Sequence, residues 1–344
     1  MTLATQMSRT VSVALLSWLA LAATAVAQSI TVGDLGITAD APFYIALDKG
    51  YFATEKLDVR LQRFRSAADA TAPLSTGQIQ VSGGGASAGL FNAFERDWPV
   101  RIVMARTRDM PGYSSDTLLV REDLKASING FADLKGKTVA VNAPYGALHY
   151  MMGKFMDSAG SSISDLKIVY MSWPDMGPAL DTKAIDAGAV TEPFAARYAE
   201  RKSAYAYKHA ADVLKDPPLE VSVILYSKDW TDAKPDQAKA FTVAYLKGMR
   251  DYYNAMTGGD QRAAVTDILI KYTSLKDRPV YDQMQWSYMD PNAELSKSSL
   301  VDQQNWYARY GAVKRKADVD KMIDTTFIDY AISKIGRVQP SARQ

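Results

Sequence analysis

The sequence predicts an α/β protein with two lobes, and three observations lead to this class. Short apolar strands alternate with segments of helix length twice along the chain. Such alternation with short links is typical of parallel sheets that helices cover on both faces. A turn-rich break at 111–115 separates the two alternating sets. The 344 residues exceed one core and suit two lobes of about 100–200 residues each.

The first residues have the features of a secretion signal. Arg9 provides a positive charge, Val11–Ala23 is apolar apart from two serines, and Ala25-Val26-Ala27 has the small-x-small pattern of a cleavage site. The apolar segment is shorter than the roughly 20 residues of a membrane helix. We therefore expect a signal peptide over 1–27, cleaved after Ala27, and export to a bacterial periplasm.

The composition excludes several classes of function. The chain holds 40 Lys and Arg against 38 Asp and Glu, without a basic block, so we expect no nucleic-acid partner. The absence of cysteine excludes disulfides, thiolate metal sites and a cysteine nucleophile. No cluster of His, Asp and Glu has the spacing of metal ligands, and we expect neither a metal nor a cofactor.

The first alternating set begins directly after the signal. Its strands are expected at 30–35, 57–64, 79–82 and 100–105. A helix that ends at Gly50 follows the first strand, a helix at 69–76 that stops at Gly77 follows the second, and a helix at 87–96 follows the third. These links are short, which favours a layered lobe.

The second set and a late helical block complete the chain. Further strands are expected at 117–120, 138–141, 166–171, 185–190 and 219–226, and helices at 235–256, 261–272, 279–289, 299–311 and 316–334. The helix from Asp236 carries apolar residues at a 3.6-residue period, which indicates a core-facing stripe. We expect the late helices to return to the first lobe. The predicted lobes are 28–112 with 221–344, and 113–220.

Several segments, in order, resemble one family. They are Ala41-Pro42-Phe43-Tyr44-Ile45-Ala46-Leu47-Asp48-Lys49-Gly50-Tyr51-Phe52, Leu74-Ser75-Thr76-Gly77-Gln78-Ile79-Gln80-Val81, Phe131-Ala132-Asp133-Leu134-Lys135-Gly136-Lys137-Thr138-Val139-Ala140, and Ile185-Asp186-Ala187 followed by Glu192-Pro193-Phe194. The chain resembles the periplasmic solute-binding proteins of ABC importers for sulfonates, taurine, nitrate and thiamine-precursor pyrimidines. Gln80 and Lys183 depart from the family, which often has Asp and Gly there.

The resemblance implies a fold and a partner. The fold is the two-lobe, type II-like periplasmic-binding-protein fold, whose lobes close like a hinge on a ligand in the cleft between them. The partners implied are a small-molecule ligand and an ABC permease at the inner membrane, and we expect a monomer.

The candidate ligand-binding residues lie in loops after strands, because ligands of open α/β sheets bind beyond the carboxyl ends of the strands. A glycine-rich turn lets the backbone approach a ligand, and a helix start offers N–H groups to an anion. Arginine pairs with carboxylate or sulfonate, and aromatic rings stack on flat ligands. The candidates are Asp40, Tyr44, Gly85, Ala86, Ser87, Arg106, Tyr145, Gly146, Ala147, Trp173, Thr191 and Glu192.

Some of these residues have a purely structural alternative. Asp40 and Ser87 are also suited to cap helices, and Tyr44 to pack one. Which of Arg65, Arg106 and Arg108 faces the cleft stays open, as does the role of His149.

One enzyme motif competes with the binding hypothesis. Gly85-Ala86-Ser87-Ala88-Gly89 matches the G-x-S-x-G nucleophile turn of α/β-hydrolases, with Ser87 as nucleophile. That family needs a downstream acid and histidine, and the chain has only His149 and His209, neither near the C-terminus. A dinucleotide fingerprint at 83–88 is weaker, because it follows the third strand. We therefore predict a non-enzymatic receptor for a small organic anion or a flat polar ring, with a secreted esterase as the alternative.

Overall fold

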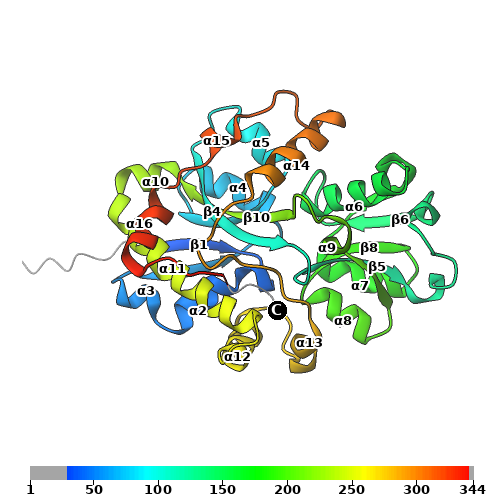
Figure 1. Ribbon diagram of the computed structural model, residues 1–344, viewed down its shortest axis with the longest axis horizontal. Coiled ribbons are helices and arrows are strands. Elements are labelled where there is room, and N and C mark those ends of the chain that lie inside the picture. The colour runs from blue at the N-terminus through cyan, green and yellow to red at the C-terminus, as the bar shows by residue number, and fades with distance from the viewer. Residues whose placement is uncertain (1–28, 341–344) are drawn as a thin grey trace, which may run out of the picture.

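The computed structural model describes residues 29–340, so the predicted signal peptide and its cleavage site lie outside the described part. Two five-stranded sheets lie side by side, each with helices on its faces (Figure 1). We call each sheet together with the helices that cover it a lobe, and we number the lobes 1 and 2 in the order in which the chain enters them. Within the described residues, no helix is long and apolar enough to span a bilayer.

Lobe 1 begins with strands and helices in alternation. Its sheet has the order β2 (Val59–Arg63), β1 (Ile30–Asp34), β3 (Val81–Gly85), β10 (Leu219–Ser227) and β4 (Val100–Asp109). The first connections hold η1 (Thr38–Asp40), α2 (Ala41–Asp48), α3 (Tyr51–Thr54), α4 (Ala67–Ser75) and α5 (Ala88–Phe94). Gly50 separates α2 from α3 with a φ of 72°, a conformation that glycine adopts without strain. Ser66 caps α4 by accepting a hydrogen bond from the N–H of Asp69.

Lobe 2 repeats the alternation on a second sheet. Its order is β7 (Lys167–Tyr170), β6 (Thr138–Val141), β8 (Ala187–Thr191), β5 (Asp116–Arg121) and β9 (Ala204–His209). Its helices are η2 (Glu122–Leu124), η3 (Phe131–Leu134), α6 (Ala147–Ser158), η4 (Ile163–Asp165), α7 (Trp173–Asp181), α8 (Phe194–Glu200) and α9 (Ala210–Val213).

The sheets are mixed, and the expectation of parallel sheets is wrong in this respect. In lobe 1, β10 returns from lobe 2 and inserts antiparallel between β3 and β4. In lobe 2, β5 runs antiparallel to both β8 and β9. The strands that carry the chain between the lobes therefore run against their neighbours. Strand β9 has no prediction from the sequence, because its half-exposed residues form no continuous apolar run.

Two predicted loops are parts of strands. Gly83 and Gly84 lie inside β3, paired with Ile224 and Val223, instead of in a loop after it. Strand β4 continues to Asp109, so Arg106 and Arg108 are strand residues. In both cases the partner strand β10 supplies hydrogen bonds that extend the strand, and local sequence does not contain that information.

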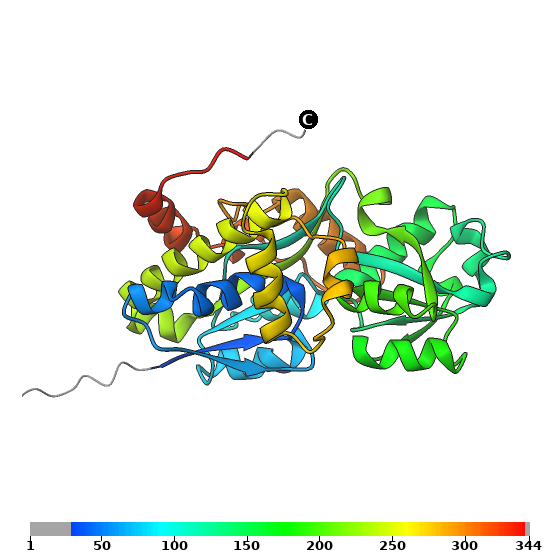
Figure 2. The same cartoon turned by 90° about the horizontal axis from the view of Figure 1, so that it is seen from below.

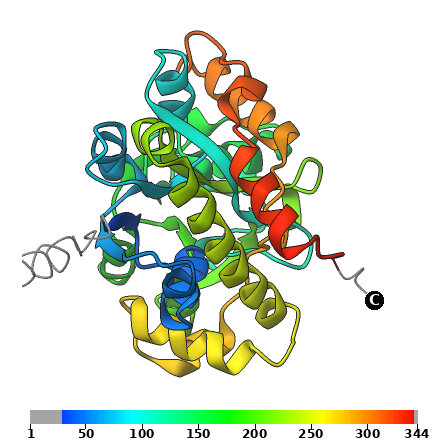
Figure 3. The ribbon, with the colours of Figure 1, turned by 90° about the vertical axis from the view of Figure 1, so that its left-hand side faces the viewer.

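The late helices are α10 (Lys228–Ala233), α11 (Pro235–Met256), α12 (Arg262–Tyr272), α13 (Arg278–Gln283), α14 (Lys297–Arg309), α15 (Val319–Met322) and α16 (Thr326–Ile335). Helix α11 packs between α2 and α16, and α11 and α16 lie side by side in Figure 3. The predicted helix at 316–334 is two helices, because Ile323 pairs with Ile102 of β4 between them. The predicted helix at 279–289 ends at Gln283.

The late block does not cover lobe 1 alone. Helix α13 lies between the lobes in the view of Figure 2 and packs on α8, while α14 packs on α6. A single apolar cluster accordingly contains Phe91 of lobe 1, Trp306 of α14 and Met152 of lobe 2. The expectation that the late helices return to lobe 1 is correct for α11, α12 and α16, and incomplete for α13 and α14.

Candidate functional site

A cavity of about 470 Å³ lies between the two lobes, and both contribute to its walls. Most of the lining residues are apolar, and the volume falls in the range of about 300–1,000 Å³ typical of small-molecule sites. The polar residues of the lining are Ser66, Thr71, Ser87, Arg106, Thr107, Ser115, Asp116, Asn142, Thr191 and Ser222. The predicted site residues that line the cavity are Gly85, Ser87, Arg106, Gly146, Ala147, Trp173 and Thr191.

The glycine-rich turn reaches the cavity through Gly85 and Ser87. Ser87 caps α5, with its Oγ accepting from the N–H of Leu90 at 3.2 Å. Ala86 is fully buried beneath the turn, where its carbonyl accepts from the Tyr307 hydroxyl at 2.9 Å. Ala86 therefore holds the turn in place, and Ser87 is both a helix cap and a cavity residue.

In lobe 2 the start of α6 faces the same cavity through Gly146 and Ala147. Tyr145 lies on the other side of this turn. Its ring stacks on His149, with ring centres 5.1 Å apart, and its carbonyl accepts from the N–H of Ala88 across the lobe boundary at 3.0 Å. Tyr145 thus joins the lobes and is not a cavity wall.

Arg106 is the arginine that reaches the cavity, and its charge is already matched. Its Nη2 donates to Asp40 Oδ1 and its Nε to the Ala39 carbonyl at 3.0 Å. Both partners of the ion pair are almost completely buried. Asp40 is behind Arg106 and does not line the cavity, and the second oxygen of Asp40 accepts from the N–H of Leu35 at 2.8 Å.

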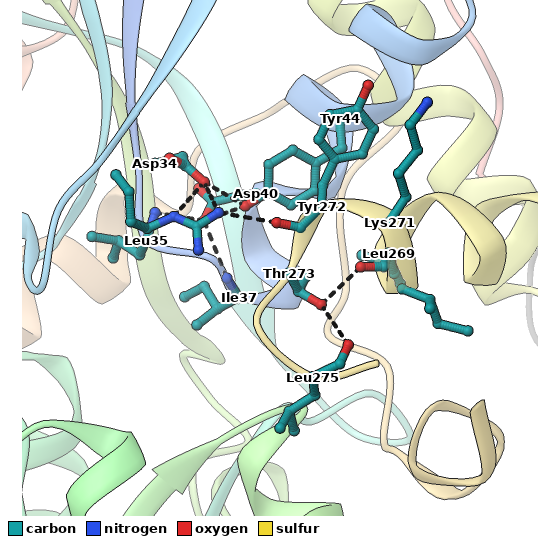
Figure 4. Close-up of polar contacts among 12 residues, drawn as sticks. Asp34, Leu35, Ile37, Asp40, Tyr44, Leu269, Lys271, Tyr272, Thr273 and Leu275 are labelled. Atoms are coloured by element: carbon teal, nitrogen blue, oxygen red, sulfur yellow. Dashed lines mark hydrogen bonds and ion pairs between the residues drawn. The ribbon is translucent and has the colours of Figure 1, made fainter. Parts of the chain in front are cut away.

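Tyr44 belongs to a polar cluster next to this ion pair (Figure 4). Its hydroxyl donates to Asp34 Oδ2 at 2.7 Å, and its ring stacks on Tyr272 with ring centres 5.1 Å apart. Arg63 pairs with the same Asp34 oxygen at 2.8 Å. Burial raises the pKa of the Tyr44 hydroxyl well above its usual range. Tyr44 is therefore a structural residue of lobe 1.

The other two arginines point elsewhere. Arg65 is exposed. Arg108 pairs with the buried Glu220 of β10 at 3.0 Å.

The sequence reasoning missed Asp116, the first residue of β5. Its side chain is fully buried in the lining of the cavity, where its carboxyl is within hydrogen-bonding reach of the Thr191 hydroxyl and the Asp109 carboxyl. Burial raises the pKa of Asp116 to about 6. Asp109, at the end of β4, accepts from the N–H groups of Ser115 and Asp116, and burial together with Asp116 raises the pKa of Asp109 well above its usual range. The sequence feature that could have pointed to Asp116 as a cavity residue is its position directly after the turn-rich break, where the chain enters lobe 2.

Trp173 and Thr191 close the lobe 2 side. Trp173 starts α7, lines the cavity and is almost fully buried, and its Nε1–H has no partner in the described chain. Its carbonyl accepts from the Tyr198 hydroxyl at 2.7 Å. Thr191 pairs with Asp116 across the two strands, so both side chains stand on one face of the sheet.

Glu192 does not line the cavity and instead joins lobe 2 to the late helices. Its carboxylate accepts from the N–H of Ala196 at 2.9 Å and from the N–H of Gln285 at 3.0 Å. Its carbonyl accepts from the Thr38 hydroxyl of lobe 1 at 3.1 Å. Burial raises the pKa of Glu192 to about 7.

The histidines are not arranged as the base of a Ser87 nucleophile. His149 Nδ1 accepts from the N–H of Tyr145 at 2.9 Å, so a neutral ring carries its proton on Nε2, and burial lowers the pKa of His149 to about 4. His209 Nδ1 bonds to the Thr117 hydroxyl at 2.8 Å. In the described part of the chain, neither ring is bonded to Ser87.

Comparison with known proteins gives a family and one relative by sequence. The family model "NMT1/THI5 like" matches residues 38–255. The nitrate/nitrite binding protein NrtA of Synechococcus elongatus is 26% identical over 244 residues, which cover 65% of this chain and 54% of that protein. The chain thus spans about half the length of the curated relative it matches.

Solved structures give the fold. The periplasmic nitrate-binding protein NrtA from Synechocystis PCC 6803 has a TM-score of 0.73 at 18% identity, with 89% of each chain covered. The ligand-binding component of an ABC-type import system from Staphylococcus aureus, with zinc bound, has a TM-score of 0.72 at 16% identity. The match covers 88% of this chain and 99% of the Staphylococcus aureus chain. The alkanesulfonate-binding protein SsuA from Xanthomonas axonopodis pv. citri, bound to MOPS, has a TM-score of 0.67 at 17% identity and covers 86% of this chain and 98% of its own.

The solved structures confirm the two-lobe periplasmic-binding-protein fold. The family model and the sequence relative confirm the resemblance found in the sequence motifs. The family match begins in η1, runs through both lobes and ends in α11. This chain belongs to the NMT1/THI5-like family.

Proposed function

We propose that this chain is the periplasmic solute-binding protein of an ABC importer, which binds a small organic ligand and delivers it to a permease. The observation that carries the proposal is the cavity between the lobes, with walls from both sheets and mainly apolar side chains. The names of the relatives, binding proteins for nitrate and alkanesulfonate, support the same class. We also propose export through the N-terminal signal and a monomeric state.

Binding by lobe closure suits this architecture. The chain passes between the sheets after β4 and before β10, and we propose lobes over 28–112 with 221–344, and over 113–220. Leu219 and Glu220, just before the second boundary, already pair with β4 of lobe 1. Two short crossings let the lobes rotate as bodies while each sheet keeps its register. Ser87, Gly146, Ala147, Trp173 and Thr191 are the proposed ligand contacts, because lobe closure brings them to one cavity.

A thermal-shift screen tests the proposal, with nitrate, alkyl sulfonates, aromatic acids and pyrimidines as probes. A probe at 100 times its dissociation constant stabilises the folded state by about 2.7 kcal/mol, a readily measured shift. For the best probe, Trp173→Ala and Ser87→Ala are expected to weaken binding measured by calorimetry while the circular dichroism spectrum is kept. Unchanged affinity in both variants would remove the proposed site.

We propose further that the protein is not an enzyme. The bonds of His149 and His209 to other groups support this view over the esterase hypothesis. An assay with p-nitrophenyl acetate on the wild type and Ser87→Ala is expected to give equal background rates. Turnover that depends on Ser87 would overturn the receptor proposal.

A further inference from the structure

The cavity between the lobes extends into lobe 1 along helix α5. Its lining follows this helix from Ser87, the N-cap, through Leu90 to Phe94 at the last helical residue. Ser87 lies at the lobe boundary, because the N–H of the following Ala88 donates to the Tyr145 carbonyl of lobe 2. A helix rises about 1.5 Å per residue, so the lining runs about 10 Å from Ser87 to Phe94, into lobe 1.

Helix α4 forms a second wall of this extension. Its lining residues Ala67, Thr71 and Leu74 follow one another at intervals of four and three, and therefore share one face of the helix. Helix α4 packs on β3 and β10, whereas α5 packs on α14. Ala67 on α4 and Ala93 on α5 are small lining residues, which leaves space between the two helices. We call the space lined by Thr71 and Leu74 of α4, Leu90 and Phe94 of α5, and Leu225 of β10 the α4–α5 compartment.

The walls of the α4–α5 compartment are apolar and partly accessible. The Phe94 side chain is half-buried, and Trp98, which lines the cavity just beyond α5, is 37% exposed. The Thr71 hydroxyl donates back to the Ala67 carbonyl at 3.0 Å, so its proton is used within α4. A ligand that removes accessible apolar surface from water gains free energy of binding. The compartment therefore favours an apolar guest.

The polar side chains of the lining lie mainly at the other end of the cavity, near the lobe boundary. Ser87 is at the boundary itself, and Asn142 and Thr191 of lobe 2 follow and end their strands. The charged residues of the lining also have partners, since Arg106 is paired with Asp40. Polar and apolar groups of the lining are thus separated along the cavity.

The cavity is too large for a small inorganic ion to fill. Its volume of about 470 Å³ is many times the roughly 30 Å³ that one water molecule occupies in the liquid. An ion such as nitrate would leave the α4–α5 compartment to water, against apolar walls. A ligand with an apolar part fills the compartment and displaces that water.

We infer that the α4–α5 compartment binds the apolar tail of an amphiphilic organic ligand, whose polar head lies at the lobe boundary. This inference rests on the proposed receptor function and narrows the ligand class, since a polar ring or an anion without a tail leaves the compartment unfilled. The tail supplies the affinity, and the head is held by the polar end of the cavity.

Two series of probes test the inference, and they separate an anionic from a neutral head. They are n-alkanesulfonates and N-alkylacetamides, each with ethyl, butyl, hexyl and octyl chains. Calorimetry at one ionic strength is expected to show one-to-one binding in at least one series. The affinity is expected to rise at least tenfold for every two added methylenes, because a buried CH₂ contributes about 0.8 kcal/mol.

A substitution in α4 tests the place of the tail. Thr71→Trp puts a large ring into the α4–α5 compartment and is expected to weaken binding of the octyl probe at least tenfold. The matched control is Ala72→Trp, the next residue of α4, which is exposed and is not part of the cavity lining. It is expected to keep the dependence of affinity on chain length.

The wild-type series decides the inference even if Thr71→Trp fails to fold. No gain in affinity with chain length, no binding of either octyl probe, or unchanged octyl affinity in folded Thr71→Trp would overturn the tail site. The receptor function fails separately, because small-angle scattering reports lobe closure. A ligand without a tail that binds as tightly as the octyl probes and closes the lobes refutes only the tail site. Octyl binding that leaves the lobes open counts against the receptor function and not against the tail site.

Discussion

The two lobes meet along two seams of different chemistry. In the first, the aromatic seam, Trp306 of α14 packs on Gly153 of α6 and edge-on to Tyr150, with ring centres 5.8 Å apart. In the second, the polar seam, Glu192 accepts hydrogen bonds from Gln285 and Thr38. The first seam is part of a continuous apolar cluster, whereas the second consists of a few bonds and a buried acid.

This difference indicates how the molecule opens. Separation of the aromatic seam exposes apolar surface to water, while broken hydrogen bonds of the polar seam are largely replaced by bonds to water. Each such bond contributes only about 0.5–1.5 kcal/mol net. We expect lobe opening to break the polar seam and keep the aromatic one. The following predictions test the contrast.

The largest loss of unfolding free energy is expected for Gly153→Ala in the aromatic seam. A Cβ at this position would overlap the Trp306 ring, which is almost fully buried and has little space to move. Overpacking costs typically about 1–3 kcal/mol, and the better helix propensity of alanine offsets up to about 1 kcal/mol. A net loss of unfolding free energy is therefore expected in urea titrations. Gly130→Ala, where a Cβ meets no atom within 4 Å, is the control, and equal effects of both changes would contradict tight packing at the seam.

The second effect concerns how the unfolding free energy depends on pH through Glu192 of the polar seam. Burial raises the pKa of Glu192 to about 7 from an ordinary value of 4.5. Between these values the folded state keeps a proton that the unfolded state has lost, so the contribution to stability is most favourable below pH 4.5 and falls as the pH rises to about 7. Glu192→Gln is expected to flatten this decline, by at most about 1.4 kcal/mol per pH unit.

Unfolding free energies measured in urea at several pH values between 4.5 and 8 provide the readout. Glu200→Gln, at the end of α8, serves as the control for a partly exposed carboxylate. An identical decline in Glu192→Gln and the wild type would assign it to other groups, with Asp116 and Asp109 first among them because their pKa values are raised too.

The smallest loss of unfolding free energy is expected for Thr38→Val, which removes one hydrogen bond of the polar seam. The expected loss of unfolding free energy is about 1 kcal/mol, and small-angle scattering of the ligand-free protein is expected to show a larger radius of gyration. Thr54→Val removes a hydroxyl bond within lobe 1 and should not change the radius. A compact Thr38→Val protein would show that the polar seam does not control opening.

The sequence predicted helices and their ends well where the signal lies within a few neighbouring residues. The serine cap of α5, the glycine after α2 and the long apolar stripe of α11 lie where they were expected. The candidate site was predicted in part. Loops after strands led to Ser87, Gly146 and Trp173 in the cavity, whereas Tyr44 and Glu192 serve the structure of a lobe and of a seam.

The sequence by itself determined the alternation of strands and helices, the division into two sets and the family motifs, because these depend on neighbours within a few residues. The tertiary structure alone decided that β10 inserts between β3 and β4, that Asp40 neutralises Arg106, and that Asp116 lies beside Asp109 and Thr191. Strand pairing and burial join residues far apart in the chain. The charge available to a ligand therefore follows from contacts that no local pattern contains.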